Sequence, residues 1–183
     1  MASTSPKRTF RIGQEKANAL GVDVTLRVGD MMNLDEDLRD FDLVYISTGG
    51  LCWVPDLDDW LIGVRSTLKP GGRMLIAEHH PLWEMMGVAG DRKLTVLSDY
   101  FGTRNLPAII DTSKAAIGVA ATSDEEDALQ SFVWGIGAVV SALIKHDFQI
   151  EALVELPYPD MFRGLGDAAD CVPAVYRLMG KRG

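Results

Sequence analysis

The clearest pattern of apolar and polar positions lies between Phe41 and Pro81. Two short apolar runs, 41–47 and 73–78, are bounded by turn residues, which is typical of fully buried parallel strands. Between them, apolar residues recur at the three- and four-residue spacing of a helix, and the stretch ends at Pro70-Gly71-Gly72. The pattern predicts a strand–helix–strand unit, whose right-handed crossover makes its two strands parallel.

Charges at the two ends support this helix. Asp56 is a candidate N-cap, and Asp58 and Asp59 place negative charge in the first turn. Arg65 and Lys69 are predicted to place positive charge in the last turn.

The pattern also predicts elements outside this unit. A helix is expected to begin at Pro6 and to close at Gly21, and a second apolar stripe at helical spacing runs over 132–144. Strict alternation over 22–28 predicts an edge strand with one wetter face, and alternating polarity over 148–155 predicts another strand. The expected strands lie near 22–28, 42–47, 73–78, 148–155 and 172–179.

Residues 87–130 have a less regular pattern, in which 94–97 and 115–121 are candidate short strands. We treat 1–183 as a single domain and 87–130 as a candidate substrate-side insertion.

Composition narrows the function classes. The 183 residues carry a net charge of −8, which argues against general binding of nucleic acid or anionic membranes. The apolar stretch 132–144 is too short for a spanning helix, so no membrane partner is expected. Cys52 and Cys171 form neither a zinc spacing nor a disulfide framework, which suits a cytoplasmic protein.

Three motifs follow one another in a recognisable order: Leu20-Gly21-Val22 leading into Gly29-Asp30, Phe41-Asp42-Leu43-Val44-Tyr45, and Leu68-Lys69-Pro70-Gly71-Gly72. With them the chain resembles the class I S-adenosylmethionine-dependent methyltransferases, from about Ser5 to Lys181. Further stretches resemble the small-molecule branch of that family: Cys52-Trp53-Val54-Pro55-Asp56-Leu57, His80-Pro81, Asp99-Tyr100-Phe101 and Phe132-Val133-Trp134.

The resemblance implies an α/β, Rossmann-like sheet of strand order 3-2-1-4-5-7-6 with its last strand antiparallel. The family's glycine-rich loop after strand 1 and its ribose-binding acid after strand 2 have no counterpart here, so a truncated sheet without strands 1 and 2 is expected. The edge at 43–46 would then need cover. We expect the strand at 22–28 to pair with it, and a homodimer or a protein partner to cover the remaining apolar surface.

The resemblance also implies S-adenosylmethionine as the cofactor, bound weakly or not at all by the isolated chain because that loop and that acid are absent. Asp30 and Met31 would lie beside the adenine, although a turn after a strand explains them too. Ser47 and Gly49 would lie at the topological switch point of the sheet, where a simple flexible turn is the alternative.

On the substrate side the resemblance points to Trp53, His79, Tyr100 and Trp134, with core packing as the alternative for the aromatic residues. His80 is the candidate general base. Adjacent histidines in an extended segment point to opposite sides, so no metal site is expected.

Three functions remain open at this point. The first is methyl transfer to a small molecule. The second is a degenerate methyltransferase-like binding or structural subunit without cofactor. The third is that the chain is a fragment whose missing strands normally precede Met1.

Overall fold

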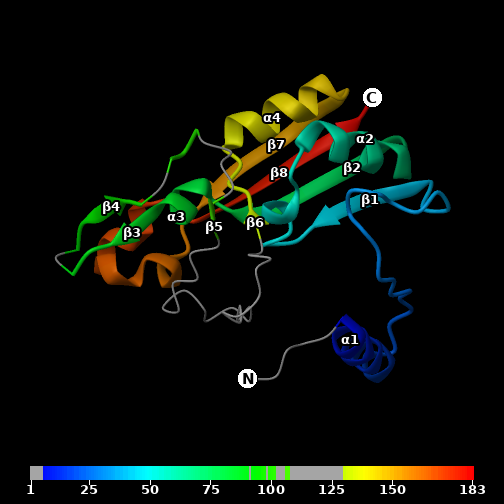
Figure 1. Cartoon of the computed structure of the whole chain (residues 1–183), viewed down its shortest axis with the longest axis horizontal. Coiled ribbons are helices and arrows are strands. Elements are labelled where there is room, and N and C mark those ends of the chain that lie inside the picture. Colours follow the sequence, from blue (N-terminus) through cyan, green and yellow to red (C-terminus); the bar gives the residue numbers. More distant parts are fainter. Residues whose placement is uncertain (1–5, 91, 98, 102–105, 108–129) are drawn as a thin grey trace.

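The computed structural model describes residues 6–90, 92–97, 99–101, 106–107 and 130–183. Their main feature is a four-stranded sheet of order β1-β2-β8-β7 (Figure 1). Its strands are β1 (Phe41–Ile46), β2 (Leu68–His79), β7 (Phe148–Leu156) and β8 (Val175–Arg182). β1 and β2 are parallel, whereas β8 is antiparallel to both of its neighbours. The predicted α/β class and antiparallel last strand are confirmed, and the order corresponds to the 4-5-7-6 part of the expected sheet.

The predicted strand–helix–strand unit is formed by β1, α2 (Leu57–Thr67) and β2. Asp56 caps α2, because its side chain accepts hydrogen bonds from the amides of Asp58 and Asp59. The helix ends before Lys69, so the prediction that Lys69 belongs to its last turn is wrong. Leu68 already pairs with the start of β1, and Lys69 instead forms an ion pair with Asp42.

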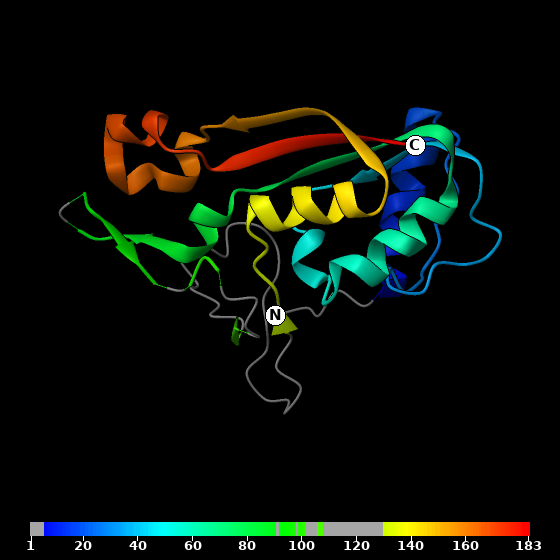
Figure 2. The ribbon, with the colours of Figure 1, turned by 90° about the horizontal axis from the view of Figure 1, so that it is seen from above.

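Two helices cover one face of the sheet. Figure 2 shows α2 and α4 (Ile136–Lys145) on the same side of the strands. Asp58 of α2 links them, since its carboxylate lies 2.5 Å from Lys145 Nζ and 2.7 Å from His146 Nε2. The core between helices and sheet includes Leu51, Trp60, Leu61, Met74, Ile76, Leu143, Tyr176 and Leu178. The helix predicted over 132–144 begins only at Ile136, because Gly135 is its N-cap and 132–134 lie outside any helix or strand.

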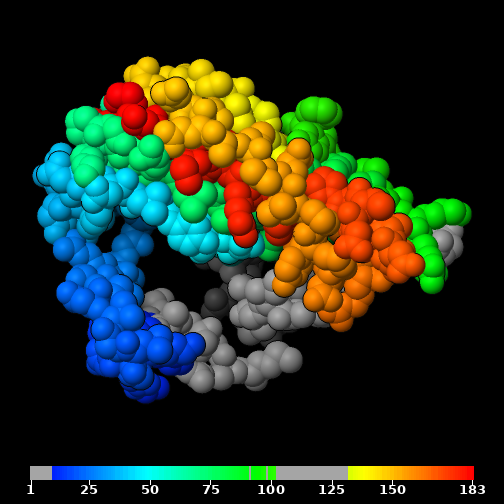
Figure 3. All heavy atoms as spheres, turned by 180° about the vertical axis from the view of Figure 1, so that it is seen from behind, coloured from blue at the N-terminus to red at the C-terminus, as the bar shows by residue number. Residues whose placement is uncertain are grey.

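The opposite face of the sheet is bare among the described residues. Figure 3 shows β1, β2, β8 and β7 side by side with no described helix over them. Leu43 and Tyr45 project from this face of β1 and are 49% and 55% exposed. In the described part of the chain no strand pairs with the outer edge of β1.

An N-terminal arm lies beside the β1 end of the sheet, formed by α1 (Pro6–Leu20) and the segment after it (Figure 1). The strand predicted at 22–28 is absent, and so is its predicted pairing with β1; both predictions are wrong. An alternating segment becomes a strand only with a backbone partner. Here Val22 N instead bonds to Ala17 O of α1, Leu26 packs against Gly13, and Val28 remains 70% exposed.

A smaller lobe lies beyond the carboxyl end of β2. It contains α3 (Pro81–Met85), the hairpin of β3 (Met86–Val88) and β4 (Leu94–Val96), and the 3-10 segment η2 (Pro159–Cys171). Its own cluster of buried residues is Phe162, Leu165, Ala169 and Ala174.

The short strand expected at 94–97 is confirmed as β4. The one expected at 115–121 lies outside the described residues, as does most of the predicted insertion at 87–130. A short ladder joins β5 (Leu106–Pro107) to β6 (Gln130–Ser131). The last strand begins at Val175 rather than at residue 172. Within the described ranges, no helix has the length and apolar character that crossing a bilayer requires.

Candidate functional site

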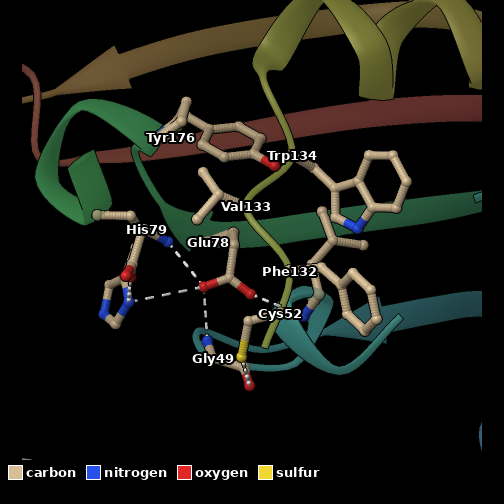
Figure 4. A pocket seen from close by; sticks show the side chains of 11 residues that line it. Gly49, Cys52, Glu78, His79, Phe132, Val133, Trp134 and Tyr176 are labelled. Carbon is tan, nitrogen blue, oxygen red and sulfur yellow. Dashed lines mark hydrogen bonds and ion pairs between the residues drawn. The ribbon is translucent and has the colours of Figure 1, made fainter. Parts of the chain in front are cut away.

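A pocket opens at the carboxyl ends of β1 and β2. Because the two strands are parallel, both end at the same edge of the sheet, where ligands bind in open α/β sheets. Gly49 and Cys52 line the pocket from the loop and the short 3-10 helix η1 (Leu51–Trp53) that follow β1. Glu78 and His79 line it from the end of β2 (Figure 4). The pocket is small and opens to solvent.

Glu78 is at the centre of this site and is 7% exposed. Its Oε1 accepts hydrogen bonds from the amides of Gly49 at 2.6 Å and His79 at 2.8 Å. Its Oε2 accepts one from the amide of Leu51 at 2.9 Å. The carboxylate therefore holds the loop after β1 against the end of β2, and these three donors satisfy a buried charge.

The segment 132–134 forms the second wall of the pocket. The amide of Phe132 donates to Cys52 O at 2.8 Å, and the Trp134 Nε1–H donates to Val54 O at 2.9 Å. These two bonds attach the segment to η1 and its C-cap residue, so the two walls are fixed to each other.

His79 forms a pair with Glu84 of α3. The two side chains are 3.2 Å apart, measured from His79 Nδ1 to Glu84 Oε1. A carboxylate only accepts, so Nδ1 carries the hydrogen and Nε2 of a neutral ring keeps its lone pair. The imidazole also packs against Trp83, with ring centroids 4.6 Å apart.

His80 lies in a different environment from His79. It is buried, it is the N-cap of α3, and its Nδ1 accepts a hydrogen bond from the amide of Leu82 at 3.0 Å. Its Nε2 therefore carries the hydrogen and donates to Glu155 at 2.7 Å. Both nitrogens are engaged and His80 does not line the pocket. The geometry suits a structural cap, and His79 is the histidine that lines the pocket.

Tyr176 reaches the pocket from β8. Its side chain is 1% exposed, and its hydroxyl has no hydrogen-bond partner within the described part of the chain. Burial, and then the negative charge of Glu78, raise the pKa of Tyr176 above its usual range. The phenol is therefore neutral and keeps its proton to donate.

Cys52 lies on the opposite wall. Its Sγ is 3.2 Å from Gly49 O, to which the thiol donates. Burial raises the pKa of Cys52 to about 12, with a further contribution from the negative charges of Glu78 and Glu84. This thiol is neutral near pH 7 and is a poor nucleophile.

Several predicted site residues lie elsewhere. Asp30 is exposed, and its Oδ1 accepts from the amide of Met32 at 2.9 Å within a local turn. Met31 is half-buried against the main core, and Trp53 is exposed on η1. None of these three lines the pocket. Tyr100 lies just outside it, where its ring would be 3.1 Å from a Cβ atom placed on Gly135.

The structure thus brings together Gly49, His79 and Trp134 of the predicted set, with Ser47 two residues before Gly49 in the same loop. Sequence reasoning missed Glu78 and Tyr176. Glu78 carried a signal, since it is an acid that directly ends a buried apolar strand. Tyr176 carried none, because an aromatic residue in a strand is ordinary core composition. No group of three or more His, Cys, Asp or Glu side chains suited to a metal ion occurs among the described residues.

Comparison with known proteins places this geometry in context. Residues 5–72 match a family model described as a methyltransferase domain. No match was found among curated proteins.

Solved structures match over nearly the whole chain. An S-adenosylmethionine-dependent methyltransferase from Mesorhizobium loti is 23% identical, with a TM-score of 0.64 over 98% of this chain and 78% of that one. Geranyl diphosphate C-methyltransferase from Streptomyces coelicolor, solved with Mg²⁺, geranyl diphosphate and S-adenosylhomocysteine, is 12% identical, with a TM-score of 0.57 over 96% and 60%. The [4+2]-cyclase SpnF is 14% identical, with a TM-score of 0.58 over 96% and 63%. At these identities the matches establish the fold, and one fold can carry several chemistries.

Proposed function

We propose that this chain is a class I S-adenosylmethionine-dependent methyltransferase and that it transfers a methyl group from that cofactor to a small molecule held in the pocket at the ends of β1 and β2. The observation that carries the proposal is the loop after β1, which Glu78 holds against the end of β2 at the switch point of the sheet. A loop that is fixed in place beside an apolar pocket is what a small-molecule site requires.

The loop after β1 fits the approach of a cofactor. Gly49 has a φ of +83°, and among the described residues beyond its two chain neighbours no atom lies within 4 Å of the position that a Cβ atom would occupy there. A ligand can therefore come close to this backbone. We assign Ser47 and Gly49 to the cofactor on this ground.

Asp30 and Met31 are proposed to contact the adenine, with the exposed Asp30 carboxylate accepting a hydrogen bond from its amino group. Among the described residues these two are separate from the pocket, so only the loop side of the cofactor site is assembled there. When bound, S-adenosylmethionine would supply an electrophilic methyl group on its sulfonium.

The chain's own residues would align the acceptor and move its proton. Glu84 keeps the hydrogen on His79 Nδ1, so His79 Nε2 is the proposed proton acceptor. Trp134 of the attached wall would exclude water and hold the acceptor in line with the methyl group. Tyr100 and Trp53 are proposed to contact parts of the substrate that extend from the mouth.

We further propose that two chains associate as a homodimer, or that a protein partner binds, through the uncovered surface around β1. Leu43 and Tyr45 are exposed there. Both cysteines are free thiols, which supports a cytoplasmic site of action.

A second candidate is a binding or structural subunit of methyltransferase fold that uses no cofactor. The observation that favours it is the unpaired outer edge of β1, because such an edge is a template for another chain.

Calorimetry with S-adenosylhomocysteine on the full chain separates the two candidates. Micromolar binding that Asp30→Ala weakens several-fold supports methyl transfer. No heat at millimolar ligand favours the subunit. A control variant, Asp160→Ala on the exposed surface of η2, should leave any binding unchanged.

A further inference from the structure

The pocket contains a buried hydroxyl that no described residue satisfies. The Tyr176 hydroxyl lies on the pocket wall beside Val133 and Trp134 (Figure 4). A buried polar atom without a partner costs free energy, which a ligand atom paired with it would recover. Because the phenol is neutral, it can act as a donor to an oxygen atom of a ligand.

The carboxylates around the pocket carry negative charge, and His79, the titratable base of its described lining, is paired with Glu84. Glu78 and Glu84 both line it, and no lysine or arginine is found among the described residues of its lining. Glu78 is buried, so its charge is poorly screened by solvent. Anionic ligands are therefore repelled, whereas a cationic group at the mouth is attracted to Glu84, which is 35% exposed.

The remaining walls are apolar. Leu51, Phe132, Val133 and Trp134 supply hydrocarbon and aromatic surface. Such walls favour a ring or a compact hydrocarbon body with few polar atoms.

We infer that the pocket selects an uncharged or cationic molecule with an apolar or aromatic body, and that the Tyr176 hydroxyl donates a hydrogen bond to a hydroxyl or carbonyl oxygen of that molecule. Carboxylates and phosphates are excluded. The inference names the substrate class of the proposed methyl transfer, and its link to catalysis rests on that proposal. Binding itself requires no cofactor and is measured separately.

Three related probes test the inference on the full chain. Tyramine carries a phenol oxygen and a cation, phenethylamine has the cation without the oxygen, and para-hydroxyphenylacetate has the oxygen with a carboxylate. NMR titration of the backbone amides of Glu78, His79 and 132–134 reports binding at this pocket.

We expect tyramine to bind about tenfold or more tightly than para-hydroxyphenylacetate, and about three- to tenfold more tightly than phenethylamine. In Tyr176→Phe, which keeps the ring, the difference between tyramine and phenethylamine should disappear. In Glu84→Gln the preference for the cation should shrink.

Equal binding of tyramine and para-hydroxyphenylacetate would overturn the charge selection. An unchanged ratio of tyramine to phenethylamine in Tyr176→Phe would overturn the donor role, and the absence of amide shifts at millimolar tyramine would overturn the pocket as a ligand site. If Tyr176→Phe does not fold, the comparison of tyramine with phenethylamine on the unaltered chain still tests the donor role. Equal binding of these two probes would overturn it.

A separate methyl-transfer assay distinguishes this inference from the proposed function. Selective binding of the probes without methyl transfer to any acceptor would contradict the proposed function and leave the inference standing. Methyl transfer that prefers carboxylate or phosphate acceptors would contradict the inference and leave the proposed function standing.

Discussion

The carboxylate of Glu78 accepts a hydrogen bond from the amide of Gly49 at 2.6 Å, although 29 residues separate the two in sequence. This contact joins the loop after β1 to the carboxyl end of β2. With the bond from Leu51, it makes the shape of the pocket depend on a single buried side chain.

We expect Glu78→Gln to lower the free energy of unfolding by about 2–3 kcal/mol, because an amide nitrogen would then face a backbone N–H donor in a buried place. Urea denaturation measures the change. The matched control is Glu151→Gln, since Glu151 pairs with Arg73 on the sheet surface and should cost clearly less. Equal losses in the two variants would show that Glu78 does not hold the loop.

Tyr176→Phe should leave the free energy of unfolding unchanged or raise it by up to about 1 kcal/mol, because it removes a buried hydroxyl that no described residue satisfies. Thermal and urea unfolding both measure this change in the free energy of unfolding. Tyr158→Phe, at an exposed tyrosine, is the control and should change nothing. A loss above about 1 kcal/mol in Tyr176→Phe would mean that the hydroxyl has a partner in the folded protein.

The two cysteines should differ in reactivity. Burial raises the pKa of Cys52 to about 12, whereas Cys171 is exposed. At pH 8 we expect a thiol reagent to modify Cys171 quickly and Cys52 only as the protein opens. Cys171→Ser should remove the fast phase, and Cys52→Ser should leave it intact. Rapid reaction of two thiols would contradict the environment described for Cys52.

The raised pKa of Cys52 also sets the sign of a pH effect. In the unfolded chain this thiol ionises near its ordinary pKa of 9.0, while in the folded chain it stays protonated to about 12. Between these values the folded state binds more protons, so stability must fall as pH rises. Cys52→Ala should make the fall in stability with rising pH less steep. If the slope is the same in Cys52→Ala, groups other than Cys52 cause the fall.

The local signals in the sequence were sufficient for elements that carry their own pattern. α2 followed from its apolar spacing and its Asp56 cap, and β7 followed from alternation. The same alternation failed at 22–28, because it reports one wetter face and cannot report whether a partner strand is present. The apolar side of the segment is not buried either, since Val22, Val24 and Val28 are 56%, 40% and 70% exposed.

The site was harder to predict than the fold. Gly49, His79 and Trp134 were expected from motifs and meet in one pocket, but the choice between His79 and His80 depended on which neighbours occupy their nitrogens. Glu155 lies on β7, 75 residues after His80, so no local pattern could have named it, whereas Glu84 lies only five residues after His79.

The outer surface of β1 gives the last prediction, which concerns assembly. Val44 packs against the main core, whereas its neighbours Leu43 and Tyr45 project from the uncovered face. A charge at Val44 would therefore damage the fold, and a charge at Tyr45 tests association alone. If two chains meet here, light scattering on the unaltered protein at tens of micromolar should give the mass of a dimer, and Tyr45→Lys should shift it toward the monomer.

The matched control for Tyr45→Lys is Ile62→Lys. Ile62 is 59% exposed and lies on α2, which covers the other face of the sheet. It offers a comparable apolar side chain away from the β1 edge, so its replacement should leave the mass unchanged. A monomer in the unaltered protein would instead mean that the apolar face of β1 stays open to solvent, against the expectation that exposed edges and large apolar patches associate. A dimer that survives Tyr45→Lys but dissociates in Ile62→Lys would move the interface to the helical face.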